Sequence, residues 1–110
     1  MEEPRIKVGL WVKAALRMGD LDGRPGVVVR RGDPDAGGVL LVLRRKEEIS
    51  VLSQVRTAAE SAWMRATGPN SVDQATADAY VARQLQRDPD LWVLEFTAPD
   101  LLPPFEAKLV

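Results

Sequence analysis

Hydrophobic residues gather in seven segments along this chain, and their spacing predicts two helices and five strands. Alternation with a period of two is typical of a strand, whereas apolar residues three or four apart indicate a helix. By these rules we expect helices at residues 6–19 and 72–87, and strands at residues 27–31, 38–45, 49–55, 61–67 and 91–97. The order α-β-β-β-β-α-β predicts an α+β fold with a single, mainly antiparallel sheet.

Two templates compete in the first segment. The alternation of residues 6, 8, 10 and 12 fits a strand, but one helical stripe also runs through Val8, Trp11, Ala15 and Met18. Residues 13–17 are strong helix formers, which favours the helix, with Gly9 as a local weakness. Residues 57–60 are ambiguous between a loop and a turn of helix.

The second helix has clear start and stop signals. Ser71 followed three residues later by Gln74 resembles a capping box, in which two side chains satisfy free backbone amides at a helix start. Pro89 ends the helix, because the residue before a proline is pushed out of the helical region. Beyond the last strand, three prolines predict an irregular tail over residues 98–110, packed by Leu101, Leu102 and Phe105.

Several strands are apolar at every position. Residues 27–29 and 39–43 contain no polar residue, and residues 91–96 are apolar on both sides except at Glu95. A half-exposed strand would alternate with polar residues, so we expect these strands to be dry on both faces. Either each helix covers one face, or both helices lie on one face and a second subunit covers the other.

The tripeptide Asp-Pro-Asp occurs twice, each time where a regular element must stop. Residues 33–35 separate two apolar strands, and the chemistry of aspartate before proline favours a turn that makes those strands an antiparallel hairpin. Residues 88–90 separate the second helix from the last strand. We refer to these two tripeptides as the first and second elbow.

The elbows are also the candidate surface site of the chain. If they lie at the same end of the sheet, their four carboxylates form a credible magnesium or manganese site with arginines as counter-ions. The opposing interpretation is a pair of rigid turns whose aspartates cap backbone amides. The candidate residues are Arg31, Asp33, Asp35, Arg83, Asp88, Asp90 and Glu95.

Glu95 stands out within its strand, because it shares a face with Leu91 and Val93. A buried carboxylate needs a partner. Arg30, Arg44 and Arg65 on other strands are the candidates, and a structural ion pair is favoured over catalysis.

Composition narrows the possible functions. The chain has 110 residues, a size that predicts one domain spanning residues 1–110 with a core over about 6–97. Fifteen basic and sixteen acidic residues nearly cancel, and aromatic residues make up only 5%, so neither nucleic acid nor a membrane is expected as a partner. The chain contains no cysteine and no histidine, which excludes the usual nucleophilic triads and zinc sites and is compatible with the cytoplasm.

Four segments in order resemble a known family. They are residues 10–14, 31–37, 63–66 and 88–95, which read LWVKA, RGDPDAG, WMRA and DPDLWVLE. Over about residues 5–97 the chain resembles a family of small bacterial proteins, mostly alphaproteobacterial, catalogued as domain of unknown function 1491. The tail after Thr97 departs from the pattern. The resemblance implies a single small domain and supplies no activity, ligand or catalytic residue.

Together these features favour a non-enzymatic binding module without a cofactor. It would act as a homodimer that associates through an apolar sheet face or an edge strand. The alternative is a small divalent-metal-dependent hydrolase, or a phosphate-ester binding protein, that uses Asp33, Asp35, Asp88 and Asp90 with Arg31 and Arg83.

Overall fold

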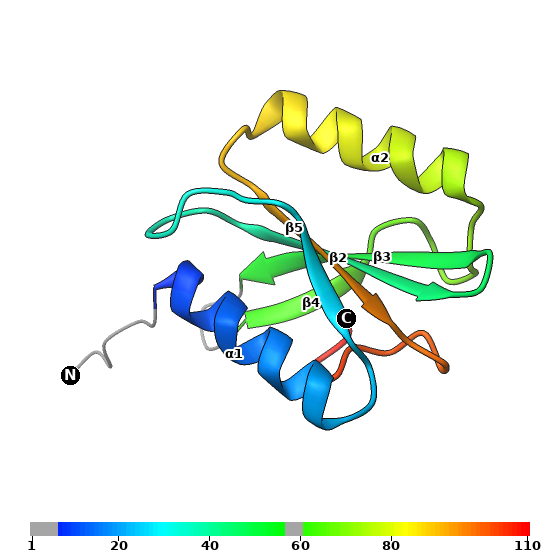
Figure 1. Ribbon diagram of the computed structural model, residues 1–110. Helices are drawn as coiled ribbons and strands as arrows, with labels where there is room; N and C mark the ends of the chain where they lie inside the picture. The colour runs from blue at the N-terminus through cyan, green and yellow to red at the C-terminus, as the bar shows by residue number, and fades with distance from the viewer. Residues whose placement is uncertain (1–6, 57–60) are drawn as a thin grey trace.

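The computed structural model describes residues 7–56 and 61–110, so the predicted helix start at residue 6 and the ambiguous residues 57–60 lie outside the described part. Its elements follow the predicted order and confirm the α+β class (Figure 1). They are α1 (Val8–Leu21), β1 (Gly26–Arg30), β2 (Val39–Arg45), β3 (Glu48–Arg56), β4 (Ser61–Arg65), α2 (Gln74–Arg87) and β5 (Trp92–Thr97). Neither helix has the length and apolarity needed to cross a membrane.

The five strands form one sheet in the order β1-β5-β2-β3-β4. β5 runs parallel to β2, and every other pair of neighbours is antiparallel. The predicted hairpin of residues 27–31 and 38–45 is therefore wrong, because β5 lies between its two strands. The physical reason is burial: β2 and β5 are both apolar on both sides, so both take central positions, and the connection over residues 31–38 is long enough to pass the end of one strand.

Two separate cores lie on the two faces of the sheet, with one helix over each (Figure 1). Alternate residues of β2 divide between them, so Val39, Leu41 and Leu43 join the core under α1 whereas Leu40 and Val42 join the core under α2. Residues 39–43 are all at most 6% exposed. The prediction that these residues are dry on both faces is confirmed, in the form in which each helix covers one face.

The strand β1 contradicts the same prediction. Val27, Val28 and Val29 are 59%, 40% and 59% exposed. β1 is an edge strand that pairs only with β5, so nothing in the described residues covers its outer side. Hydrophobic patterning alone does not separate a central strand from an edge strand of the same composition.

The two helices differ from their predicted details at single residues. α2 is capped by Asp73, whose carboxylate accepts a hydrogen bond from the Thr76 amide at 2.8 Å, and not by Ser71. Val72 exchanges backbone hydrogen bonds with Ile49, which holds residue 72 extended and delays the helix. On α1 the buried positions are Val12, Ala15 and Gly19, whereas Met18 is 45% exposed.

The tail contains no long element, as predicted, but it is well packed. Leu101 is buried, Phe105 is half-buried and Leu102 is 39% exposed. The Phe105 ring meets Trp11 edge-on at 5.4 Å, and Trp11 stacks on Trp63 at 5.9 Å. The tail thereby ties α1 to β4 on the α1 side of the sheet.

Candidate functional site

The two elbows meet at the start of β5. The Asp33 amide donates a hydrogen bond to the Asp90 carbonyl at 3.0 Å, and the Trp92 indole donates to the Asp33 carbonyl at 2.8 Å. This close approach requires glycines, because a Cβ at Gly32 would lie 2.6 Å from the Leu91 carbonyl carbon. The first elbow therefore crosses the start of β5 in close backbone contact with it, and we call this crossing segment the strap.

Two of the four elbow carboxylates, those of Asp33 and Asp88, accept hydrogen bonds within their own turns. The Asp33 carboxylate accepts hydrogen bonds from the amides of Asp35 and Ala36 at 2.8 and 3.0 Å, which lower the pKa of this carboxyl. The Asp88 carboxylate accepts from the Asp90 amide at 3.1 Å, and Asp35 lies 3.5 Å from the Lys7 ammonium. Over residues 7–56 and 61–110, no three carboxylates are grouped so that they could hold a metal ion.

The remaining predicted site residues contact other parts of the molecule. The Arg31 guanidinium lies 5.7 Å from the centroid of Trp92, and that of Arg83 lies 6.0 Å from the centroid of Tyr80 on α2. Glu95 forms an ion pair with Arg44 at 3.3 Å, one of the three predicted partners. Glu95 is three residues into β5 from Trp92, about 10 Å further along the sheet than the elbows.

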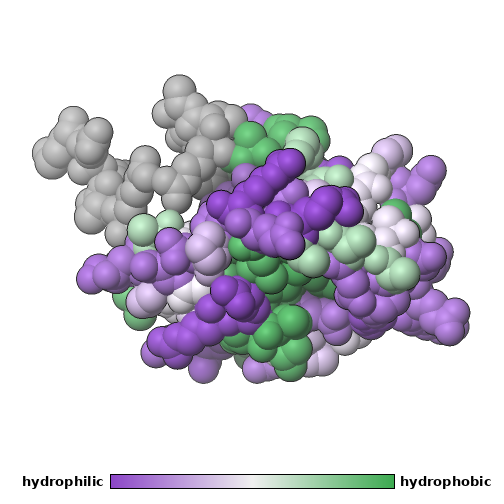
Figure 2. Space-filling model, turned by 90° about the horizontal axis from the view of Figure 1, so that it is seen from above, coloured by the Kyte–Doolittle hydropathy of each residue, from purple (hydrophilic) through white to green (hydrophobic). Residues whose placement is uncertain are grey.

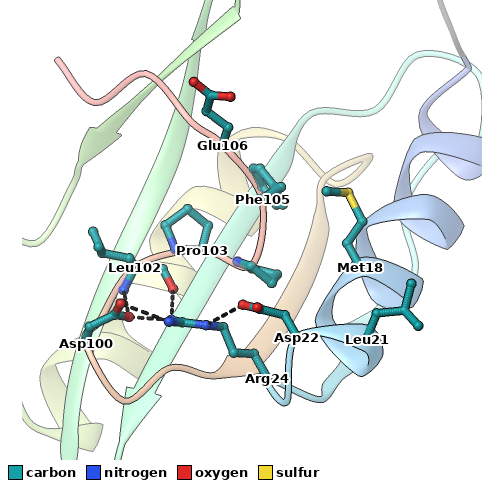
Figure 3. A pocket seen from close by; sticks show the side chains of 10 residues that line it. Met18, Leu21, Asp22, Arg24, Asp100, Leu102, Pro103, Phe105 and Glu106 are labelled. Atoms are coloured by element: carbon teal, nitrogen blue, oxygen red, sulfur yellow. Dashed lines mark hydrogen bonds and ion pairs between the residues drawn. The ribbon is translucent and has the colours of Figure 1, made fainter.

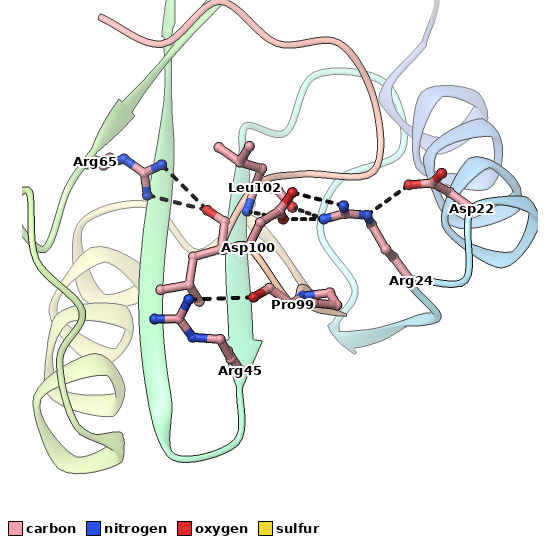
Figure 4. A network of polar contacts seen from close by, with 8 residues as sticks. Asp22, Arg24, Arg45, Arg65, Pro99, Asp100 and Leu102 are labelled. Atoms are coloured by element: carbon pink, nitrogen blue, oxygen red, sulfur yellow. Dashed lines mark hydrogen bonds and ion pairs between the residues drawn. The ribbon is translucent and has the colours of Figure 1, made fainter.

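Three arginines converge on the first turn of the tail (Figure 4). The sequence indicates Arg65 only as a candidate partner of Glu95 and assigns no role to Arg24 or Arg45. Arg24 donates hydrogen bonds to the carboxylates of Asp22 and Asp100 and to the Leu102 carbonyl. Arg45 donates to the Pro99 carbonyl, and Arg65 donates twice to the Leu101 carbonyl, each at 3.4 Å. We call these three side chains, Arg24, Arg45 and Arg65, the arginine clamp.

The arginine clamp has electrostatic and conformational consequences. Hydrogen bonds from Arg24, together with the Leu102 amide and the guanidinium charge, lower the pKa of Asp100 to about 2. The hydrogen bond to Asp100, and then the contact with Asp22, raise the pKa of Arg24. Leu101 between them has a φ of 56°, a left-handed conformation that a leucine rarely adopts. No spacing rule links residues 24, 45 and 65 to residues 99–102, so the sequence offered no signal for this cluster.

A groove lies between the C-terminal half of α1 and the tail (Figure 3). Its volume is about 470 Å³. Its lining combines apolar side chains with charged ones, and Arg24 with its partners forms one end of it. The lining residues are Met18, Leu21, Asp22, Arg24, Asp100, Leu102, Pro103, Pro104, Phe105 and Glu106.

The open edge of β1 is the second exposed apolar feature. Seen from the side of α2, hydrophobic residues reach the surface between hydrophilic ones (Figure 2). The pairing of β1 with β5 is regular from Gly26 to Val28 and shifts by one residue before Arg30. Arg30 at the end of β1 is its one charged residue, and Gly26–Val29 have no charge to discourage pairing with another strand.

Comparisons with known proteins identify a family with this sequence pattern. Residues 6–106 match the family model described as protein of unknown function DUF1491, which extends beyond Thr97, where we expected the resemblance to end. No curated protein matches the chain.

Three solved structures share the fold. A crystal structure of a DUF1491 family protein from Caulobacter crescentus has a TM-score of 0.84 and 29% identity, covering 96% of this chain and 100% of that chain. An NMR structure of a DUF1491 family protein from the same organism has a TM-score of 0.83 and 27% identity, covering 98% and 99%. A solution structure from A. tumefaciens has a TM-score of 0.80 at 20% identity, covering 94% and 95%, and shows the fold alone. The family model covers most of the chain, and the protein therefore belongs to the DUF1491 family.

Proposed function

We propose that this protein is a non-enzymatic binding module that self-associates through the open edge of β1. The observation that carries this proposal is the exposure of Val27, Val28 and Val29, at 59%, 40% and 59%, on an edge strand. Exposed hydrophobic edge strands present free backbone groups that pair readily with another strand. Chemistry has less support, because the carboxylates of Asp33 and Asp88 are engaged in their own turns and the described residues contain no metal-binding group.

Association through a sheet face has no support in this fold. α1 and α2 each cover one face, and the residues of β2, β3 and β5 that point toward them are largely buried. The outer edge of β1 is the part of the sheet where apolar side chains and backbone groups are exposed together. Of the two modes of self-association expected from the sequence, the edge strand is the one we retain.

The backbone geometry of β1 defines a register for the dimer. The Thr97 amide donates to the Pro25 carbonyl at 3.0 Å, so the backbone groups of residue 25, and of Val27 two residues later, point toward β5. The groups of Gly26 and Val28 then point outward. An antiparallel pair centred on Val27 would join Gly26 of each copy to Val28 of the other.

A second copy is a suitable occupant of this edge because the pairing is self-complementary. Between Gly26 and Val28 the facing positions are glycine and valine, so no like charges oppose each other within this stretch. The irregularity after Val28 limits the regular pairing to a short stretch, which favours a reversible dimer over an extended assembly. We place this activity in the cytoplasm, with which the absence of cysteine is compatible.

A single introduced cysteine tests the register, since the chain has no cysteine of its own. In the proposed dimer Val27 lies directly opposite its copy at a non-hydrogen-bonded position, where Cβ atoms are about 4.5–5.5 Å apart. We expect Val27→Cys to form a disulfide-linked dimer under mild oxidation, seen on a non-reducing gel. Leu10→Cys is the matched control, because Leu10 is 60% exposed but lies on α1.

Sedimentation of the unmodified protein completes the test. We expect a monomer–dimer equilibrium with a dissociation constant in the micromolar range, as is typical of a small interface (about 1 µM corresponds to 8.2 kcal/mol). A pure monomer at all concentrations, together with equal cross-linking of Val27→Cys and Leu10→Cys, contradicts the proposal.

A further inference from the structure

We propose that the groove between α1 and the tail binds a short peptide segment in which an arginine or lysine adjoins bulky apolar residues. This site does not depend on dimerisation through β1, because none of its lining residues belongs to Gly26–Arg30.

The walls of the groove offer apolar surface that the fold leaves uncovered. Leu21 is 77% exposed, Met18 is 45% exposed and Leu102 is 39% exposed. They stand beside Phe105 and two prolines around a space of about 470 Å³ (Figure 3), which is within the usual range of about 300–1,000 Å³ for ligand sites. Burying such side chains against a partner is favourable at roughly 25 cal/mol per Å² of apolar area.

The charges around the groove select the partner. Among the lining residues Arg24 is the only cation, and Asp22, Asp100 and the Leu102 carbonyl already occupy its donors. Glu106 contributes a third carboxylate to the lining. With three carboxylates and one guanidinium, the lining has a net formal charge of −2, so the groove favours a cation.

The tail side of the groove is held in place before any partner arrives. The arginine clamp fixes the carbonyls of Pro99, Leu101 and Leu102 (Figure 4). On the same side, Phe105 packs against Trp11 and Trp63. A preformed wall lowers the entropy that is lost when a partner binds. The left-handed backbone at Leu101 is maintained by these same contacts.

Together these properties fit a basic, apolar peptide segment. The apolar walls provide contact area, and the excess carboxylates pair with a lysine or arginine at the rim. The same negative charge repels nucleic acid and anionic lipid surfaces. The groove is open along its outer side between α1 and the tail, which suits a chain that runs along it (Figure 3).

The probe for this site is the capped pentapeptide Leu-Arg-Phe-Arg-Leu, added to the full chain at low salt. Binding is measured by calorimetry and by the fluorescence of Trp11 and Trp63, which lie against Phe105. The same peptide with glutamate in place of arginine is the charge control, and we expect it to bind at least about tenfold more weakly, equivalent to 1.4 kcal/mol. Binding should also weaken as salt rises, because exposed charges are screened.

Two substitutions in the groove are paired with two controls outside it. We expect Leu21→Ser and Glu106→Lys each to weaken binding of the arginine peptide by about fivefold or more, as for contacts near an interface centre or rim. Leu10→Ser and Glu47→Lys change exposed residues of the same types elsewhere and should leave binding unchanged. All four sites are exposed, so the variants are expected to fold.

Several results would overturn the proposal. The first is no binding of the arginine peptide up to about 1 mM, a concentration that corresponds to a binding free energy of about 4.1 kcal/mol. The second is equal affinity for the glutamate peptide. The third is an equal loss of affinity in the groove variants and the control variants. Repeating the measurement with Val27→Lys, which removes pairing at β1, separates this site from the dimer. Unchanged peptide binding in that variant supports a groove that acts independently.

Discussion

Arg24 shows how one side chain can organise a region that the sequence describes only as a loop. Its guanidinium donates to two carboxylates and a carbonyl, which joins the end of α1 to the tail 76 residues later in the chain. The pair with Asp100 is bidentate, so two parallel hydrogen bonds fix the relative orientation of the two groups, which a single lysine ammonium cannot do as well. Such a contact is invisible to local patterning, because it depends on where the tail turns back.

The pH dependence of stability should report this pair. The pKa of Asp100 is lowered from 3.8 to about 2 in the folded protein, so its contribution is fully present above about pH 4 and is lost as the pH falls toward 2. Asp100 is 44% exposed, so we expect an effect below about 1 kcal/mol. Urea unfolding at pH 5, 3 and 2 should show a smaller acid loss for Asp100→Asn than for the natural chain.

A second substitution assigns that effect to the ion pair. Arg24→Gln should reduce the acid loss by a similar amount, and the double variant should add little further, because both changes remove one interaction. Equal acid loss in the natural chain and in both single variants would contradict the assignment.

At the scale of elements, the apolar runs identified all five strands, but the predicted pairing of residues 27–31 with residues 38–45 was wrong. Neighbouring strands in sequence usually pair, which favoured a hairpin of residues 27–31 with residues 38–45. In the structure the first elbow instead crosses the start of β5, and its glycines let the backbone pass close to Asp90. Adjacency of the two elbows was raised from the sequence only as a condition, because it depends on this crossing.

Two glycine substitutions should move stability in opposite directions. A Cβ at Gly37 would overlap the Asp90 carbonyl and lie 2.9 Å from that of Asp33, so Gly37→Ala should destabilise by about 1–3 kcal/mol. Gly9 lies within α1, and a Cβ there would be 3.4 Å from the Pro34 side chain, which is an ordinary van der Waals distance. Gly9→Ala should therefore stabilise by up to about 0.5–1 kcal/mol.

Chemical denaturation at neutral pH measures both effects. The same replacement at two glycines that face the same strap makes each variant the control of the other. A loss of stability at Gly9 equal to that at Gly37 would show that the tight crossing over β5 is not the cause.

At the scale of the whole molecule, each face of the sheet is covered by a helix and one edge remains apolar and open. The rule that doubly apolar strands need cover holds for β2 and β5, which are buried, and fails for β1. The rule fails for β1 for a physical reason, because three consecutive valines fit a buried central strand and an exposed edge strand that pairs with another chain equally well. The sequence predicted the need for cover but not that β1 would be left uncovered by residues 7–56 and 61–110.

Thermal unfolding at different protein concentrations tests what covers β1. If a second copy pairs with Val27 only in the folded state, the unfolding midpoint should rise by a few degrees over a hundredfold increase in concentration, by mass action. Val27→Lys places a charge of the kind that guards natural edge strands, so its midpoint should not depend on concentration. Because Val27 is 59% exposed, this variant should still fold. Leu10→Lys, at an equally exposed apolar position on α1, should keep the concentration dependence, and its loss there would point to an interface other than β1.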